Sequence, residues 1–146
     1  MKMATRARYG ARLMFELALD HGKGLTLLRD VARREGLSEK YLSQIIIPLR
    51  VRGLVISGRG ARGGYRLARP PDKITMKDIV EALDGELALT DRVRRPEVQE
   101  RYPGWITQSV WDRLGRAMAE TLSEITLQSL LDDYARRVGA PVAYDI

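Results

Sequence analysis

One stretch decides the fold: Val51-Arg-Gly-Leu-Val-Ile-Ser-Gly-Arg-Gly-Ala-Arg-Gly-Gly-Tyr-Arg-Leu67. Two short runs of alternating apolar residues flank a loop of glycine and arginine, a pattern typical of a β-hairpin. The glycines let the backbone bend and approach another surface closely. Arg59 and Arg62 in the loop are charged and do not contribute to an apolar core. Planar guanidinium groups bind phosphates and fit a narrow groove of DNA. We therefore interpret the hairpin as the wing of a winged helix.

The composition limits the classes of protein to consider. A chain of 146 residues suits one compact domain, or a small domain with an appended helical arm. It contains no cysteine, which removes disulfides, thiolate zinc sites and thiol catalysis and agrees with a reducing compartment. No segment has the apolar core of a signal peptide or the length of a membrane span. We expect a cytoplasmic protein that does not bind membranes.

The charge is unevenly distributed along the chain. Residues 1–70 hold 15 Lys and Arg against 5 Asp and Glu, whereas residues 71–146 hold 10 against 14. A basic first half joined to an acidic, helix-patterned second half is typical of a nucleic-acid-binding domain attached to a module that does not touch nucleic acid. The alternative is a basic surface that is merely solvated.

The spacing of apolar residues predicts a first helix over 7–20, with one buried face made by Tyr9, Leu13, Leu17 and Ala18. Gly22 and Gly24 follow directly, as expected for a helix stopped by glycine. The one histidine, His21, is predicted to cap the end of this helix in favourable contact with its dipole.

Two further helices are predicted before the hairpin. Thr26 is the expected N-cap of a helix over 27–35, and Ser38 is the expected N-cap of a helix over 39–51. Gly36 lies between them and can adopt the left-handed conformation that a short turn requires. The pair therefore has the length and glycine content of a helix-turn-helix.

The helix over 39–51 has the pattern of a recognition helix, whose first turn meets base edges while its far face packs on the domain. Pro48 is expected to kink or shorten its last turn. The residues expected to face inward are Leu42, Ile45, Ile46 and Leu49, and those expected to face outward are Lys40, Ser43, Gln44 and Ile47.

After the hairpin, Pro70-Pro71 breaks the chain and Thr75 is the predicted N-cap of a helix over 76–83, with Ile79, Val80 and Leu83 buried. The charged, proline-containing segment that follows has no clean period and is expected to be a loop. These patterns divide the chain into a winged helix-turn-helix domain at 1–85, a linker or effector loop at 86–104, a dimerisation helix and terminal helix at 105–138, and a flexible tail at 139–146.

A second helical pattern starts at Trp105 and runs to about residue 122. Its apolar stripe at three- and four-residue spacing must be covered, and we favour a second subunit over packing within one chain. Thr126 is the predicted N-cap of a final helix that ends near Val138. The stripe that we assign to dimerisation is Trp111, Leu114, Met118, Leu122 and Ile125. The predicted fold class is mainly α with a small β-hairpin.

Five segments in order along the chain resemble the Rrf-type bacterial regulators. They are Arg8-Tyr9-Gly10, Leu37-Ser38-Glu39-Lys40-Tyr41-Leu42-Ser43-Gln44, Leu49-Arg50, Gly53-Leu54-Val55 and Arg59-Gly60-Ala61-Arg62-Gly63-Gly64-Tyr65. The family includes an iron-sulfur cluster regulator, a nitric-oxide-sensing repressor and a cysteine-metabolism repressor. The resemblance runs from residue 1 to about 137. It implies a homodimeric winged-helix transcription factor, most simply a repressor, that binds an imperfect inverted repeat in double-stranded DNA.

The resemblance also implies which residues contact DNA. Ser38, Lys40, Tyr41, Ser43 and Gln44 fall where the family contacts DNA from the recognition helix, and Arg59 with Gly60 falls at the wing in the minor groove. Several relatives carry glutamate where this chain has Ser43, so their operator sequence does not transfer. Tyr41 has two interpretations, a base contact or a packed ring whose hydroxyl meets phosphate or water. The arginines expected to neutralise phosphates are Arg6, Arg8, Arg50, Arg59 and Arg62.

Cluster-bearing members of the family place three cysteines in the segment that corresponds to 91–108, and this chain has none. An iron-sulfur cluster built as in those members is therefore excluded, and we expect no cofactor. Gln108 falls near the position at which one branch has a histidine ligand. The cysteine-free pattern most resembles the cysteine-metabolism branch, whose members sense through a partner enzyme of cysteine biosynthesis.

Other functions remain as alternatives. The winged helix could serve RNA binding or protein assembly, in which case it would not prefer palindromic duplex. An enzyme is not expected, because the usual nucleophile and acid-base groups are missing. A small-molecule effector is expected to act at 91–104, because that segment joins the basic half to the dimer arm. The acidic residues that a metal sensor would use are Asp91, Glu97, Glu100 and Asp112.

Overall fold

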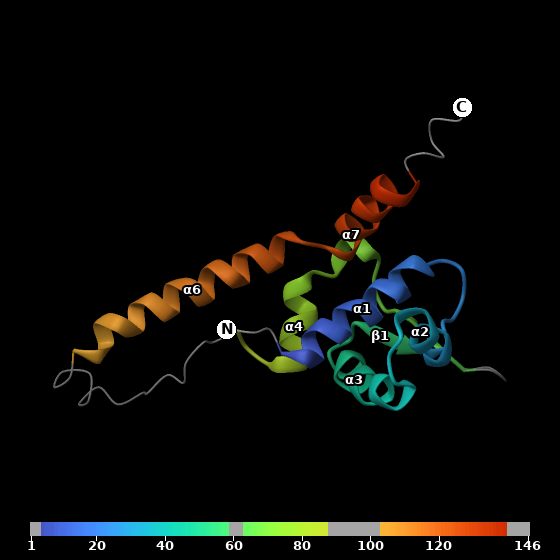
Figure 1. Ribbon diagram of the computed structural model, residues 1–146, viewed down its shortest axis with the longest axis horizontal. Helices are drawn as coiled ribbons and strands as arrows, with labels where there is room; N and C mark the ends of the chain where they lie inside the picture. Colours follow the sequence, from blue (N-terminus) through green and yellow to red (C-terminus); the bar gives the residue numbers. More distant parts are fainter. Residues whose placement is uncertain (1–3, 59–62, 88–102, 140–146) are drawn as a thin grey trace.

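The computed structural model describes residues 4–58, 63–87 and 103–139 of the chain. These residues form a mostly helical body with one antiparallel hairpin, and a long helix extends away from it (Figure 1). Helix α1, Thr5–Leu19, runs through the middle of the body, with α7 above it and α3 below it in that view. The predicted fold class is confirmed.

The predicted helix-turn-helix is present. Helix α2 spans Leu28–Glu35 and ends at Gly36, whose φ of 64° is the left-handed conformation expected of it. Helix α3 spans Glu39–Val51, and the Ser38 hydroxyl caps it by accepting a hydrogen bond from the backbone N–H of Tyr41. The expected shortening at Pro48 is wrong, because α3 continues as one helix to Val51.

The prediction that Thr26 caps α2 is also wrong. The N-cap position of α2 is Leu27, which has no side-chain cap. The Thr26 hydroxyl instead donates to the Asp20 carboxylate over 2.8 Å, and its backbone N–H and carbonyl each pair with Tyr65 at 2.8 Å. Thr26 therefore ties the wing to the end of α1, and this tertiary contact outweighs the local capping preference.

The hairpin consists of β1, Val55–Ser57, and β2, Tyr65–Leu67. Its register pairs Val55 with Leu67, Ile56 with Arg66 and Ser57 with Tyr65. Val55 and Leu67 are buried against the helices, so the side chains of Ile56 and Arg66 lie together on the outer face. The predicted tip residues Arg59, Gly60 and Arg62 lie outside the described residues.

A short 3-10 turn, η1, covers Pro71–Lys73 and leads into α4, Met76–Asp84. Thr75 and Asp78 form a capping box at the start of α4, as the sequence predicts for Thr75. Helix α4 packs closely on α1: a Cβ added at Gly10 would lie 2.1 Å from a methyl carbon of Leu83. Gly10 is therefore required by a helix contact and not by its backbone conformation. The predicted core positions Ile79, Val80 and Leu83 are buried.

The C-terminal part begins with α6, Gly104–Glu124, a helix of 21 residues. It is followed by α7, Leu127–Tyr134, and by a π-helical turn, η2, Ala135–Gly139. Thr126 caps α7 as predicted. Leu127 is fully buried in the core cluster, and the Tyr134 ring lies 5.5 Å from the Phe15 ring of α1. Thus α7, which the sequence grouped with α6, packs on the winged-helix body.

A two-residue bridge fastens the junction of α6 and α7 to the start of α4. The N–H of Met76 donates to Ile125 over 2.8 Å, and the N–H of Leu127 donates to Ile74 over 2.9 Å. The capping threonines of α4 and α7, Thr75 and Thr126, are paired in this bridge. None of the helices in the described parts of the chain combines the length and the hydropathy of a membrane span.

Candidate nucleic-acid interface

Helix α3 presents one polar, exposed face and buries the other. The side chains of Leu42, Ile45, Ile46 and Leu49 are at most 1% exposed and hold the helix on the core. On the opposite face Lys40, Ser43, Gln44 and Ile47 are exposed, as the sequence predicts. Rigid attachment of one face lets the other offer donors and acceptors to a duplex with little reorganisation.

Two serines in the first turns of α3 already have backbone partners. The Ser38 hydroxyl accepts from the N–H of Tyr41 over 3.2 Å, and the Ser43 hydroxyl donates to the Glu39 carbonyl over 2.9 Å. With its proton engaged, Ser43 is arranged to accept a further hydrogen bond. Lys40 and Gln44 supply donors beside it, so the first two turns can read mixed donor and acceptor patterns.

Tyr41 is half-buried, and its ring meets the Tyr9 ring edge-on with 5.7 Å between centroids. The guanidinium of Arg12 lies 5.5 Å from the centroid of Tyr9, and its Nε donates to Glu35 of α2 over 2.8 Å. This arrangement favours the interpretation in which the Tyr41 ring packs on the domain. The same contacts join α1, α2 and the start of α3.

A second group of charges lies at the interface of α1 and α2. The guanidinium of Arg34 donates to Glu16 over 3.1 Å and to Asp20 over 3.3 Å. Burial of the Glu16 carboxyl, reinforced by its hydrogen bond with Glu35, raises the pKa of Glu16 above its ordinary value of 4.5, and Arg34 opposes this rise. The Asp20 carboxylate also accepts a hydrogen bond from the Thr26 hydroxyl. The charged residues that connect α1 to α2 are therefore linked to the base of the wing.

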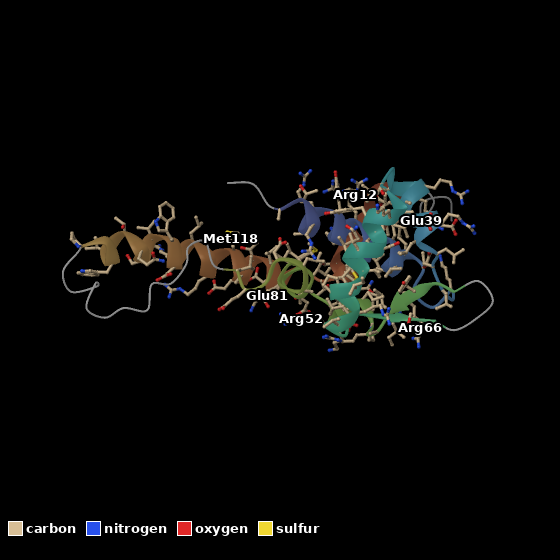
Figure 2. All side chains as sticks on the ribbon, turned by 90° about the horizontal axis from the view of Figure 1, so that it is seen from below. Arg12, Glu39, Arg52, Arg66, Glu81 and Met118 are labelled. Carbon is tan, nitrogen blue, oxygen red and sulfur yellow. The ribbon has the colours of Figure 1, made fainter. Side chains whose placement is uncertain are left out.

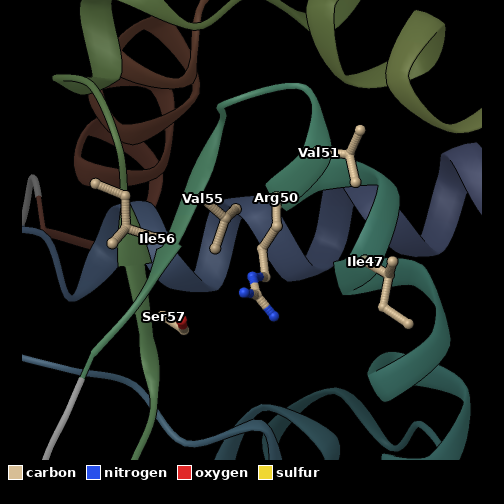
Figure 3. A pocket seen from close by; sticks show the side chains of 6 residues that line it. All are labelled: Ile47, Arg50, Val51, Val55, Ile56 and Ser57. Carbon is tan, nitrogen blue, oxygen red and sulfur yellow. The ribbon is translucent and has the colours of Figure 1, made fainter.

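A groove of about 470 Å³ separates the second half of α3 from strand β1. Arg50 extends into this space, with Ile47 on the helix side and Ser57 on the strand side (Figure 3). The groove also contacts Val51, which is 80% exposed, and Ile56, which is 39% exposed. We call it the α3–β1 groove, and its lining residues are Ile47, Arg50, Val51, Val55, Ile56 and Ser57.

Sequence reasoning missed some residues of this surface. Arg66 projects from β2 beside Ile56, and Arg52 lies at the C-terminal end of α3 (Figure 2). The alternation of the hairpin would have placed Arg66 on the outer face, because Leu67 next to it must be buried. Ile47 was assigned an outward position but no contact with DNA.

Comparison with known proteins identifies the family. The Rrf2 family model, described as an iron-dependent transcriptional regulator, matches residues 3–133. The chain belongs to the Rrf2 family of transcriptional regulators. It is 42% identical over 130 residues to the HTH-type transcriptional regulator CymR of Bacillus subtilis, with 89% of each protein covered. The predicted family resemblance is confirmed.

Solved structures of Rrf2 relatives have the same fold as this chain. The structure of CymR, titled the global cysteine regulator of B. subtilis, matches with a TM-score of 0.73 and 41% identity over 89% of this chain and 95% of that one. The structure of T. potens IscR matches with a TM-score of 0.77 and 39% identity over 94% of this chain and 91% of that one. These relatives are transcriptional regulators and not enzymes, as predicted. As a member of this family the chain is a transcriptional regulator, and DNA binding follows from the family.

Arg6 and Arg8, two of the arginines predicted to contact phosphate, are exposed in the first turn of α1. Arg8 lines a second groove of about 400 Å³, in which α1 faces α4 and the C-terminal part of α6. Tyr9, Arg12, Met76, Val80 and Leu122 also line this groove. Arg50 is the predicted phosphate contact that the structure brings next to the exposed face of α3.

The predicted dimerisation stripe is partly covered by its own chain. Trp111 is 43% exposed, whereas Leu114, Met118, Leu122 and Ile125 are half-buried. Met118 lies in the half of α6 nearer the body (Figure 2). The most exposed apolar side chains of α6 are Trp105, Ile106 and Val110, between 54% and 56% exposed. The most exposed apolar side chains of α6 therefore lie nearer the start of the helix than the predicted stripe does.

The metal and cofactor predictions fall mostly outside the described residues, since Asp91, Glu97 and Glu100 lie in 88–102. Among the residues that the structure describes, no three His, Asp or Glu side chains form a group that could hold a metal ion. Gln108 donates to Asp112 over 3.2 Å. The backbone N–H of His21 donates to Ala18 over 3.2 Å at the end of α1, and its side chain is exposed.

Proposed function

We propose that this Rrf2 protein is a homodimeric repressor that binds an imperfect inverted repeat in double-stranded DNA. The observation that carries the proposal is the exposed face of α3, where Lys40, Ser43 and Gln44 stand opposite four buried aliphatic residues. The helix offers hydrogen-bonding groups at its N-terminal end, which is the end that meets base edges in helix-turn-helix proteins. Repression follows when the bound dimer covers a promoter.

Affinity comes first from phosphates. Arg50 projects from α3 into the α3–β1 groove, and Arg66 adds a charge on the outer face of the hairpin. If Arg6, Arg8, Arg50, Arg59 and Arg62 each neutralise one phosphate, the logarithm of the binding constant falls with the logarithm of salt concentration by about 0.9 per contact. The complex is therefore expected to weaken steeply as salt rises.

The partner in the proposed dimer is a second copy of this chain, and α6 supplies the contact. Helix α6 extends beyond the body, and its exposed apolar side chains have no cover from the described parts of their own chain. Pairing two such helices removes this surface from water. The dimer would then place two copies of α3 about 34 Å apart, one turn of the duplex.

We further propose that DNA binding requires no iron-sulfur cluster and that the regulated genes serve cysteine or sulfur metabolism. The chain has no cysteine to ligate a cluster in the way cluster-bearing relatives do. Its similarity to CymR, titled a global cysteine regulator, supports the choice of genes. The signal is then a partner enzyme of cysteine biosynthesis or a small-molecule effector.

Selection of genomic DNA tests the proposal. Purified protein, treated with an iron chelator, is mixed with sheared genomic duplex and with total RNA at about 0.15 M salt, where non-specific phosphate binding is weak. We expect enrichment of an inverted repeat upstream of genes for sulfur metabolism. Enrichment of RNA, or of no nucleic acid, would contradict the proposal, and enrichment that requires added iron would contradict its cofactor component.

A matched pair of variants assigns the binding to α3. Lys40→Ala removes a charge from the exposed face of α3, and Lys73→Ala removes the same charge from η1, which packs against α7 on the far side of α1. We expect Lys40→Ala to weaken binding to the recovered repeat about tenfold, the loss of one good contact, and Lys73→Ala to leave it unchanged. Equal effects of the two substitutions would mean that α3 does not read the duplex.

A further inference from the structure

The exposed face of α3 contains an apolar side chain in its middle. Ile47 is 56% exposed, one helical turn after Gln44 and one turn before Val51. Its side chain has no group that could donate or accept a hydrogen bond, so it takes no part in the polar pattern offered by Lys40 and Gln44. Nothing in the packing of α3 requires Ile47, because the core face is filled by Leu42, Ile45, Ile46 and Leu49.

Ile47 is part of a larger apolar surface. Together with Val51 and Ile56 it lines the α3–β1 groove, and the three side chains are 56%, 80% and 39% exposed. Exposed apolar patches with a polar rim mark binding surfaces. The groove is cationic, because Arg50 extends into it (Figure 3). Arg66 lies opposite Ile56 in the register of the hairpin and adds a second charge on its outer face.

The charge and the position of the groove select its occupant. An apolar peptide would leave Arg50 without an anionic partner, whereas a nucleic-acid strand brings phosphates for Arg50 and sugar carbons for Val51 and Ile56. On α3 the groove begins at Ile47, one helical turn after Gln44. A duplex that places base edges against Lys40 and Gln44 therefore brings the next base step to Ile47.

We propose that the α3–β1 groove takes one strand of the operator and that Ile47 determines specificity by contacting the 5-methyl group of a thymine. This inference rests on the proposed function. In the major groove thymine presents a methyl group, and apolar side chains recognise it by contact. Cytosine carries only hydrogen at C5 and so lacks the methyl contact with Ile47, which disfavours cytosine at the same position.

The test removes single methyl groups from the recovered operator. Each thymine of a half-site is replaced in turn by uracil, which keeps the base pair and its hydrogen bonds and loses only the methyl. We expect one position in each half-site at which the replacement weakens wild-type binding about fourfold, the effect of one buried methyl group. All other replacements are expected to have little effect.

Substitution of Ile47 then shows which residue reads the methyl group. Ile47→Ala is expected to weaken binding to the thymine operator and to show no further loss on the uracil operator, so that the two changes are not additive. Val138→Ala, which shortens a 58% exposed valine of η2, is the matched control and is expected to retain the fourfold thymine preference. Because Ile47 is exposed, its truncation leaves the core intact.

The possible negative results distinguish failure of this inference from failure of the proposed function. A wild-type protein that binds the operator equally well with thymine and uracil at every position overturns the assignment of Ile47 and leaves the proposed function standing. If Ile47→Ala retains the same thymine preference, the assignment of Ile47 is again overturned and the proposed function stands, because another residue must then contact the methyl group. Absence of any selected duplex overturns the proposed function and this inference together.

Discussion

The ring of Tyr9 in α1 meets the ring of Tyr41 in α3 edge-on, with 5.7 Å between their centroids and 88° between their planes. Arg12, one turn after Tyr9, lies over the Tyr9 ring and also binds the Glu35 carboxylate of α2. Three helices therefore meet at one aromatic pair and one arginine. The orientation of α3, and with it the position of Lys40 and Gln44, depends on this contact.

Truncation of Tyr9 tests the stabilising effect of the pair. We expect Tyr9→Ala to lower the free energy of unfolding by about 2 kcal/mol, since it removes an edge-to-face contact worth about 1 kcal/mol and part of a half-buried ring. Tyr9→Phe keeps the ring and is expected to cost less than about 0.5 kcal/mol. Urea denaturation of the three proteins measures the difference. Equal losses in the two variants would assign the stability to the hydroxyl and not to the ring.

The charges beneath the helix-turn-helix predict a dependence of stability on pH. Burial and the hydrogen bond with Glu35 raise the pKa of Glu16, so the folded state binds this proton more tightly than the unfolded chain does. The stability that this group contributes is fully present below its ordinary value of 4.5 and is lost as pH rises through the raised folded-state pKa.

Glu16→Gln isolates this effect, because an amide resembles the protonated carboxyl and does not titrate. We expect the unfolding free energy of the wild type, measured relative to Glu16→Gln, to fall as pH rises from about 4 through the raised pKa. Glu120→Gln on the exposed face of α6 controls for loss of a carboxylate elsewhere. A relative stability that rises over the same pH range would show that the ion pair with Arg34 outweighs burial.

Arg59 at the wing is predicted to contribute directly to DNA binding. We expect Arg59→Ala to weaken binding to the operator by about 1 to 3 kcal/mol, the value of a good groove contact. If the contact is to phosphate, the salt dependence of a dimer loses about two ion equivalents as well. Gel-shift titrations at several salt concentrations measure both quantities, with Lys73→Ala as the control. If Arg59→Ala binds the operator with unchanged affinity, the wing does not contribute to DNA binding through Arg59.

The proposed dimer interface is tested on α6. We expect the double substitution Trp111→Asp and Leu114→Asp to yield monomers, because it places two charges on a face that another chain must cover. Arg116→Asp, on the exposed polar side of the same helix, is expected to remain dimeric. Sedimentation velocity gives the masses, and circular dichroism verifies that α6 is still helical. A dimer mass for the double variant would place the interface elsewhere.

Local signals were sufficient for much of the fold. Ser38, Thr75 and Thr126 were each predicted to be N-caps, and each accepts the expected backbone hydrogen bond. Gly36 adopts the left-handed conformation that its place between two helices required. The pattern of buried residues in α3 was also predicted, because its apolar spacing is helical and unambiguous.

The features that sequence analysis missed depend on contacts between residues far apart in the sequence. Thr26 has the sequence of a helix cap, but Asp20 and Tyr65 engage it, and neither partner is recognisable from the local sequence. The burial of Leu127 in the core was not foreseen, because it depends on packing against distant helices. The α3–β1 groove could not be predicted either, because it depends on the distance between a helix and a strand and not on a motif in either one.

The bridge between Ile74–Met76 and Ile125–Leu127 holds one end of the long helix α6, so a rotation at this bridge moves the other end of the helix. Helix α6 has 21 residues and is about 31 Å long, and its C-terminal end is fastened by this bridge to the start of α4. A rotation of about 5° at the joint moves the far tip by about 3 Å, a distance comparable to the rise of one base pair. In the proposed dimer, small changes at the two capping threonines would therefore move the far end of α6 and change the spacing between the two subunits.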